Sequence, residues 1–347
     1  MKKTVTIHDI ARIAEVSSAT VSRVLSNSSY PVSDKLRSKI LRIAKEHNYI
    51  PNLIGKQLKT NASMTIGVII PTITNPFYSS VILGIEEIAR QNHYHVIVCN
   101  SLHNPEFEGE YIKTMVEKQI KGLIISSISK DVSLLKQFMR AGLNVIAIDQ
   151  KIDEDEITQI EFNYEKGGYM AAQHLLALGH TRIGYATSRL DRPSRRDIHA
   201  GYLRAMEEAG LPALVEESQS EEAFNSTGEF DVGKRLAARM LAASTPPTAI
   251  FACNDMMAFG VINELMLRGI SVPGEISVIG FDGIEFGKMT HPPLTTIKQP
   301  DYEMGILSGK ILLDMMRGDE NPTLSVTLQP KLVERASAAQ AHTSSPI

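Results

Sequence analysis

From Thr65 onward, short continuous apolar runs alternate with helical patterns, and this alternation limits the possible folds more than any other feature of the chain. Between the runs, apolar residues recur at helical spacing, as at Ile82, Ile85 and Ile88. Strands that are apolar on both faces are typical of parallel sheets covered by helices on both sides. The runs are TIGVII (65–70), YHVIV (94–98), GLIIS (122–126), NVIAI (144–148), RIGYA (182–186), TAIFA (248–252) and ISVIGF (276–281). Seven such runs fit two doubly wound sheets better than one, so we expect an α/β body with two subdomains.

The same pattern predicts where the chain crosses between the two sheets. It pauses at the acidic, turn-rich segment 151–163 and again at HPPLTTIKQP (291–300), before a last strand LSVTL (324–328). We therefore expect a body of residues 65–335, with a first subdomain of about 65–161 and 297–323 and a second of about 162–292 and 324–335. A tail, 336–347, follows the body. It has no heptad pattern, so we expect no coiled coil.

The charges are divided unevenly along the chain. The whole sequence has 36 Lys and Arg against 39 Asp and Glu, a net charge of −3. Residues 1–60 contain eleven Lys and Arg against four Asp and Glu, a net charge of +7, which leaves −10 for the remainder. This asymmetry indicates a basic head that binds nucleic acid on an acidic body. A solvated helical face is the alternative interpretation of the basic residues.

Several classes of protein are excluded or disfavoured. The two cysteines, Cys99 and Cys253, exclude a disulfide scaffold and a Cys-rich zinc module. The chain begins without a signal-peptide pattern and contains no apolar run of 18 residues, so we expect a cytoplasmic protein. Phosphate-binding, dinucleotide-binding, zinc-protease and nucleophile-elbow motifs are missing from the sequence. We therefore expect a protein that is not an enzyme and that has no metal and no cofactor.

The basic head, residues 1–50, reads as three short helices. Thr6 can cap a helix that carries Ile7, Ile10 and Ala14 on one face, and Asp9 stands where a capping box has Glu or Gln. Ser17 can cap a second helix, and a third starts after Ser33-Asp34 and ends at His47-Asn48-Tyr49, before Pro51. Two short helices joined by a tight turn form a helix-turn-helix, whose second helix enters the major groove of DNA. The residues of that helix outside its buried stripe are Ser18, Ala19, Thr20, Ser22 and Arg23.

The segments VTIHDIARIAEVSSATVSRVL (5–25) and YIPNLIGKQLK (49–59) resemble the head and hinge of the lactose repressor/galactose repressor family. The resemblance implies that Ser18, Ala19 and Arg23 read bases, and that Ser17, Thr20 and Ser22 contact phosphates. It also implies a hinge helix within 51–64 that inserts Leu58 into the minor groove. Thr6, Asn52 and Gly55 complete the expected DNA-binding set.

Two residues of this region depart from the family pattern. Glu15 stands where the family usually has glycine, which tolerates a positive φ better than other residues do. Gly55 stands where the family often has alanine, and glycine inside a helix costs about 1 kcal/mol. We therefore expect the hinge to become helical only when it meets DNA and the second hinge of a dimer.

The resemblance continues through the body to about Arg335, where it implies the fold of periplasmic sugar-binding proteins. It is carried by NPFYSSVILGIEE (75–87), LGHTRIGY (178–185), TAIFACNDMMAFG (248–260), ISVIGFD (276–282) and PPLTTIKQP (292–300). Ligands in open α/β sheets bind beyond the carboxyl ends of the strands. The effector-binding residues expected from position and resemblance are Phe77, Ser126, Asp149, Arg196, Phe224, Asn254, Asp282 and Gln299.

Simpler interpretations exist for some of these residues. Asn254 and Asp255 precede a helix and can be its caps, Asp282-Gly283 is an ordinary turn sequence, and the arginines of 189–196 can form a solvated cluster. Many family members have a second effector-binding arginine two residues after Arg196, where this chain has Ile198. Phe162-Asn163 stands where the family often has Asp-Asn. Both departures predict a less charged pocket.

The function expected from these observations is that of a dimeric transcriptional regulator. It would bind a pseudo-palindromic operator in double-stranded DNA and repress genes of carbohydrate use. A small sugar-like effector would change the order of the hinge helices, and either induction or corepression fits the sequence. The alternatives are a global carbon regulator controlled by a phosphorylated protein and, from another class, a sugar-binding or transport module.

Overall fold

The computed structural model of the chain describes residues 5–25, 30–49, 63–218, 228–318 and 325–341. Contacts divide the chain into two compact units, Met1–Ala62 and Ser63–Ile347. None of the described helices is long and apolar enough to cross a membrane.

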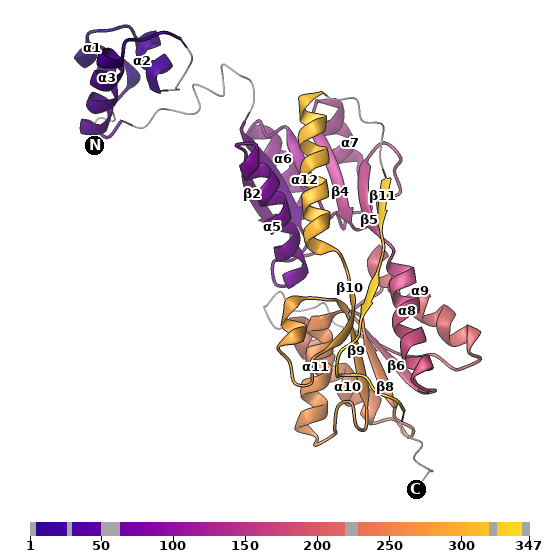
Figure 1. The fold of residues 1–347 in the computed structure, drawn as a ribbon. Coiled ribbons are helices and arrows are strands. Elements are labelled where there is room, and N and C mark those ends of the chain that lie inside the picture. Colours follow the sequence, from indigo (N-terminus) through magenta and orange to yellow (C-terminus); the bar gives the residue numbers. More distant parts are fainter. Residues whose placement is uncertain (1–4, 26–29, 50–62, 219–227, 319–324, 342–347) are drawn as a thin grey trace. The chain divides into compact units, whose positions relative to one another are not determined.

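The described part of the first unit packs three short helices around one small core. They are α1 (Ile7–Ala14), α2 (Ser18–Leu25) and α3 (Asp34–Glu46), as Figure 1 shows. Each helix buries the apolar stripe that the sequence predicts. The buried core consists of Ile10, Ala11, Ala14, Val21, Val24, Ile40 and Ile43. The three predicted helices are thus confirmed.

Both ends of α1 are built as the sequence suggests. Thr6 Oγ1 accepts a hydrogen bond from the Asp9 backbone N at 3.3 Å, and Asp9 Oδ2 accepts from the Thr6 backbone N at 3.0 Å. Asp9 therefore completes the capping box that usually requires Glu or Gln. The helix ends at Glu15, whose φ of 59° lies in the left-handed region. Glu15 thus occupies a conformation that glycine adopts without strain.

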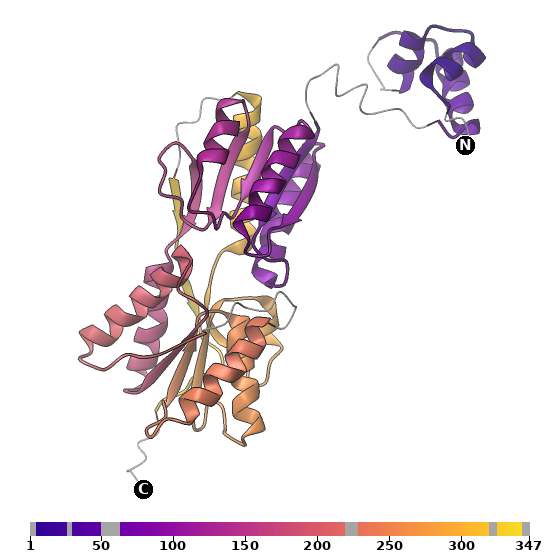
Figure 2. The same cartoon turned by 180° about the vertical axis from the view of Figure 1, so that it is seen from behind.

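The second unit contains two six-stranded sheets, and Figures 1 and 2 show helices packed on them. The first half has the strand order β11-β5-β4-β3-β1-β2, and the second half has the order β12-β10-β9-β8-β6-β7. All pairs are parallel except β10 with β12. The predicted fold class, α/β with two doubly wound sheets behind a helical head, is confirmed.

The bounds of the elements are as follows. The first half comprises β1 (Thr65–Ile70), α5 (Pro76–Gln91), β2 (His95–Asn100), α6 (Pro105–Glu117), β3 (Gly122–Ile125), α7 (Ser133–Arg140), β4 (Asn144–Asp149), β5 (Thr158–Phe162), α12 (Asp301–Arg317) and β11 (Ser325–Leu328). The second half comprises α8 (Tyr164–Ala177), β6 (Ile183–Thr187), α9 (Pro193–Glu208), β7 (Leu214–Glu217), α10 (Gly228–Leu241), β8 (Ala249–Ala252), α11 (Asp255–Leu267), β9 (Ser277–Asp282), the 3-10 helix η1 (Glu285–Lys288), β10 (Thr295–Lys298) and β12 (Lys331–Val333).

Alternate residues of the central strands pack against different helices. Val68 and Ile70 of β1 belong to the same apolar core as Ile85 of α5, whereas Ile69 packs in a separate core with Ile112 of α6. Because both faces are covered, these strands read as unbroken apolar runs in the sequence.

The predicted division of the body is wrong at two strands. β11 was assigned to the second subdomain with 324–335, but it pairs with β5 in the first sheet. Ile297 and Lys298 were assigned to the first subdomain, but they belong to β10, which pairs with β9 in the second sheet. Both strands are too short for their sequence to show which sheet they complete, because that choice depends on pairing with distant residues.

The predicted tail is also wrong for residues 336–341. Ser337 is fully buried at the amino ends of two strands, where its hydroxyl accepts from the Thr295 backbone N at 2.7 Å and donates to Val278 O at 2.6 Å. Ala339 O lies 3.0 Å from Nε2 of His180. These contacts satisfy strand ends that would otherwise be buried without partners, so the segment is part of the second half.

Paired glycines bring neighbouring helices into backbone contact. A Cβ on Gly201 of α9 would lie 2.0 Å from the Glu165 carbonyl oxygen, and a Cβ on Gly168 of α8 would lie 2.1 Å from the Ile198 carbonyl oxygen. Similar pairs join α5 to α12 and α10 to α11. The contact between α8 and α9 lies at Ile198 and Gly201, in the turns of α9 that follow Arg195.

Candidate functional site

The exposed face of α2 carries the residues that the sequence analysis assigns to DNA. Ala19, Ser22 and Arg23 are exposed, whereas Ser18 and Thr20 are half-buried beside the core. The face presents one guanidinium among small and hydroxylic side chains. This combination suits close approach to phosphates together with a bidentate contact to one base.

Contacts of Ser17 and Arg23 shape this face, whereas Thr6 acts at α1. Ser17 Oγ accepts from the Thr20 backbone N at 3.2 Å, so Ser17 caps α2 as predicted. The Arg23 guanidinium lies over the Tyr30 ring, 3.9 Å from its centroid. The Thr6 hydroxyl donates to Asp9 Oδ2 at 2.7 Å, so its structural role is the cap of α1. The hinge residues Asn52, Gly55 and Leu58, and Phe224 of the body, lie outside the described residues.

A buried polar cluster lies where the carboxyl ends of the two sheets of the body face each other. Two of its carboxylates, Asp149 and Asp282, end β4 and β9. Both have a positive φ, 66° and 104°, and non-glycine residues with such strained backbone are concentrated at functional sites. We call this set the interdomain cluster: Asn75, Tyr78, His103, Ser126, Asp149, Gln150, Tyr164, Ser188, Arg192, Ser194, Arg195, Glu229, Asn254, Asp282 and Gln299.

Asp149 accepts hydrogen bonds from four side chains. The hydroxyls of Tyr78 and Ser126 donate to its Oδ2 at 2.7 and 3.0 Å, and Gln150 Nε2 donates at 2.7 Å. The Tyr164 hydroxyl, from the second half, donates to Oδ1. Burial, reinforced by the Asp149 charge, raises the pKa of both tyrosines well above 10. The tyrosines therefore remain donors and hold Asp149 between the halves.

Asp282 also joins the two halves. Asn75 Nδ2, from the first half, donates to its Oδ2 at 3.1 Å, and Gln299 Nε2 donates to its Oδ1 at 2.8 Å. Burial, followed by the charge of Asp255, raises the pKa of Asp282 well above its ordinary value. Burial also raises the pKa of Asp255 to about 7, against hydrogen bonds that lower it.

Phe77 does not offer an open aromatic face in this structure. Phe77 is 2% exposed and belongs to the same apolar core as Val81 and Ile85 of α5. Its ring lies edge-on to Tyr78, with centroids 5.1 Å apart. The Phe77 backbone N donates to Asn75 Oδ1 at 3.0 Å, so Phe77 supports the turn that positions Asn75.

Arg195 occupies the position that the sequence analysis gave to Arg196. Arg196 is exposed, donates to Asp191 O at 3.0 Å and lines a hollow of about 480 Å³ that Tyr164 of the cluster also lines. Arg195 is 6% exposed. It lies three residues before Ile198 on the buried face of α9, whereas Arg196 is turned away by one residue of helical rotation. Because Arg195 pairs with Glu229, the expectation of a less charged pocket stays a prediction.

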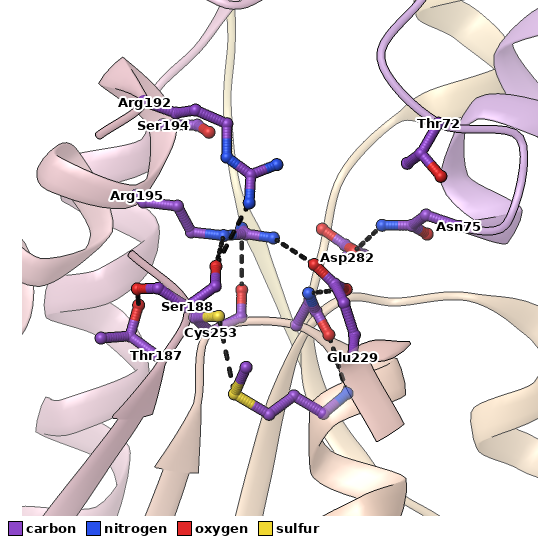
Figure 3. Close-up of polar contacts among 12 residues, drawn as sticks. Thr72, Asn75, Thr187, Ser188, Arg192, Ser194, Arg195, Glu229, Cys253 and Asp282 are labelled. Atoms are coloured by element: carbon purple, nitrogen blue, oxygen red, sulfur yellow. Dashed lines mark hydrogen bonds and ion pairs between the residues drawn. The ribbon is translucent and has the colours of Figure 1, made fainter. Parts of the chain in front are cut away.

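Figure 3 shows contacts of Arg195 with Ser188, Cys253 and Glu229. Its Nε donates to Ser188 Oγ at 3.2 Å, its Nη1 donates to Cys253 O at 3.2 Å, and its Nη2 pairs with Glu229 Oε1 at 3.4 Å. Arg192 Nη2 donates to the same Ser188 oxygen at 3.2 Å. Two guanidinium groups thus converge on one serine, and the interpretation of these two arginines as solvated is wrong.

Asn254 is both a helix cap and a member of the cluster. Its Oδ1 accepts from the Met257 backbone N at 2.8 Å at the start of α11, which confirms the cap interpretation. Its Nδ2 donates to Glu229 Oε2. The amide therefore fixes the carboxylate that pairs with Arg195.

Two further contacts join the halves. Gln150 Nε2 donates to Ser194 Oγ at 3.0 Å, and Arg192 Nη1 donates to His103 Nδ1 at 3.4 Å. In Figure 3, Arg192 and Arg195 face Asn75 across the space between the halves. A ligand held here would contact both halves at once, so the cluster can couple binding to their relative position.

The sequence analysis missed several members that matter for this coupling, among them Asn75, Arg192, Arg195 and Glu229. The helical period of the sequence could have identified Arg195 as a buried residue of α9. Residues 195, 198, 202 and 205 follow the helical period of the buried stripe of α9. Asn75, Arg192 and Glu229 have no comparable signal, because their partners are distant in the sequence.

Comparison with protein families gives two matches. Residues 6–52 match the family model described as "Bacterial regulatory proteins, lacI family". Residues 172–338 match the model described as "Periplasmic binding protein-like domain". Together they cover the helical head and most of the second half of the body.

Whole-length relatives agree with these matches. The chain is 31% identical to the HTH-type transcriptional repressor PurR of Aliivibrio salmonicida over 96% of its own length and 98% of that protein. It is similar to the crystal structure of the lac repressor dimer bound to operator and the anti-inducer ONPF, with a TM-score of 0.81, 30% identity and coverage of 97% and 100%. It is also similar to a lacI-family regulator of Enterococcus faecium with bound ribose, with a TM-score of 0.71, 30% identity and coverage of 80% and 99%.

Proposed function

The chain belongs to the lacI family of bacterial DNA-binding transcriptional regulators, and on this premise we propose that it is an effector-controlled repressor of carbohydrate-utilisation genes and not an enzyme. In this proposal α2 reads an operator half-site in the major groove. The interdomain cluster binds a small hydroxyl-rich effector. The observation that carries the proposal is that side chains of both halves are hydrogen-bonded to each other at the carboxyl ends of both sheets.

The effector acts by changing how the two halves meet. Asp149 and Asp282 each accept hydrogen bonds from both halves. A ligand that replaces these donors would stabilise one arrangement of the halves over another, and its effect is limited to its difference in affinity for the two. The coupling between effector and operator is typically about 1–3 kcal/mol.

The protein acts as a homodimer in this proposal, since one short recognition helix reads a half-site only. Apolar side chains on the body support this. Ile97 and Val98 are 40% and 39% exposed on β2, the edge strand of the first sheet, and Phe286 and Met289 are 52% and 74% exposed on the second half. Exposed apolar side chains at these places can contribute to a subunit interface.

The test is a titration of the full-length protein with operator DNA selected from a random pool. We expect the protein to bind a palindromic site far more tightly than random DNA. We also expect a sugar or sugar derivative to change the affinity for that site. Arg23→Ala should lose most of the discrimination between operator and random DNA, at about 1–3 kcal/mol per base contact. A response only to a phosphorylated protein would support the alternative regulator, and no preference for any DNA sequence would refute the proposal.

A further inference from the structure

The turn between α1 and α2 contains a strained residue. Glu15 has φ 59° and ψ 43°, a left-handed conformation that is unfavourable for residues other than glycine. Residues 15–17 join the end of α1 at Ala14 to the start of α2 at Ser18. The backbone angles of Glu15 therefore help to set the direction in which α2 leaves α1.

Two hydrogen bonds within the end of α1 support this turn. The Val16 backbone N donates to Ala11 O at 3.0 Å. The Glu15 backbone N donates to Arg12 O at 3.3 Å. Together the two bonds form a helix end of the type that most often has glycine at its left-handed residue. This chain forms the same helix end with a glutamate.

A third bond reaches the turn from another helix. Lys39 of α3 donates from its Nζ to Ala14 O at 2.9 Å, across 25 residues of the sequence, and its side chain is half-buried. The last carbonyls of a helix have no partner within it, and a cation there also favours the negative end of the helix dipole. Because a peptide is planar, the bond to Ala14 O holds one of the two peptide planes that meet at Glu15.

The direction of α2 matters for the bases that it reads. The helix has 8 residues, which makes it about 12 Å long at about 1.5 Å per residue. A change of about 10° in its direction would move its far end by about 2 Å. Arg23 lies in the last turn of α2, and a hydrogen bond to a base edge tolerates far smaller displacements than this.

We propose that Lys39 is a positioning residue for operator recognition. Its hydrogen bond to Ala14 O stabilises the turn that Glu15 strains, and so keeps α2 in the direction in which it reads bases. Lys39 acts through α2 and makes no base contact itself. The inference rests on the proposed function for its effect on DNA, whereas the coupling between Lys39 and Glu15 can be measured without DNA.

Hydrogen exchange of the Val16 amide in the full-length protein measures the stability of the turn. Lys39→Met removes the donor and keeps the length of the side chain, so exchange should be about tenfold faster, equivalent to about 1.4 kcal/mol. Lys39→Arg can still donate and should restore most of the protection. Lys45→Met removes the same charge from an exposed position of α3 and should change exchange by less than about twofold. Equal exchange in the two methionine variants would refute the proposal.

A double variant tests whether the bond compensates for the strain. In a Glu15→Gly background, Lys39→Met should speed exchange of the Val16 amide by less than about threefold, because glycine adopts the left-handed conformation unaided. An equal effect in both backgrounds would contradict the proposal. If Lys39→Met alone unfolds the head, the double variant should fold again, and its failure to do so would also contradict the proposal.

The functional measurement is the ratio of affinities for the selected operator and for random DNA at fixed salt. Lys39→Met should lower this ratio by about tenfold or more, and Lys45→Met by less than about twofold. If Lys39→Met weakens binding to both DNAs alike and reduces its salt dependence, Lys39 contacts a phosphate and the inference is wrong. If the unmodified protein prefers no DNA sequence, the proposed function is wrong, and the exchange measurements still decide whether Lys39 supports Glu15.

Discussion

Asn75 and Asp282 connect the two halves of the body by one hydrogen bond, from Nδ2 to Oδ2 at 3.1 Å. Asn75 also caps α5, because its Oδ1 accepts from the Phe77 backbone N at 3.0 Å. One amide thus performs a local task with its oxygen and an interdomain task with its nitrogen. The two tasks can be separated by substitution.

Asn75→Asp keeps the oxygen that caps α5 but replaces the interdomain donor by a second carboxylate. The expected result at pH 7 is a free energy of unfolding lower by about 1–3 kcal/mol, and a larger radius of gyration of the ligand-free protein by X-ray scattering. Asn104→Asp is the matched control, because Asn104 caps α6 through Glu106 N at an exposed site. Equal behaviour of the two variants would contradict the interdomain role of Asn75.

The free energy of unfolding should depend on pH because Asp255 titrates at a raised pKa. Its pKa in the folded protein is about 7, against an ordinary value of 3.8, so the folded state binds more protons than the unfolded state between these values. The contribution of Asp255 to stability therefore falls as the pH rises from about 4 to 7, by up to about 4 kcal/mol.

Asp255→Asn removes this titration and keeps the side chain's shape. Its amide can still accept from the Ile284 backbone N and donate to the Thr296 hydroxyl. In urea unfolding from pH 4.5 to 8, the stability of the wild type relative to this variant should decrease with rising pH. A constant difference between the two proteins across this range would refute the assignment.

Gly201→Ala should disturb α9 because its Cβ would meet the Glu165 carbonyl oxygen at 2.0 Å. The expected loss is about 1–3 kcal/mol in the free energy of unfolding. Gly109→Ala on α6 is the control, since its nearest heavy atom beyond the helix would be Leu134 Cδ2 at 3.5 Å. That variant should be unchanged or more stable by about 0.5–1 kcal/mol. Thermal and urea unfolding of both variants would measure these differences in stability.

Glu15 should lower the stability of the head because its φ of 59° is unfavourable for a residue other than glycine. Glu15→Gly relieves the strain, and the net gain should be up to about 1 kcal/mol after the greater flexibility of unfolded glycine is subtracted. Glu15→Gln removes the same charge and keeps the strain. Hydrogen exchange of the Val16 amide, which donates to Ala11 O at 3.0 Å, should slow in the glycine variant alone. Equal exchange in both variants would show that charge, and not backbone strain, is the cause.

Local patterns predicted much of this protein. The capping box of Thr6 and Asp9, the stripe of Val21 and Val24, and the left-handed turn at Glu15 follow from residues close in the sequence. The continuous apolar strands also predicted two covered parallel sheets. These features are readable because helical period, strand period and capping depend on backbone geometry over a few residues.

By itself, then, the sequence determined the helical head, the α/β body and the exposed face of α2. Tertiary structure alone decided that β11 completes the first sheet, that Ser337 closes the second half, and that Asn75 meets Asp282. It also placed the Arg195 guanidinium beside Glu229 and left Arg196 exposed. Strand pairing and side-chain contacts of this kind join residues far apart in the chain, so their energies depend on the assembled fold and leave no local pattern.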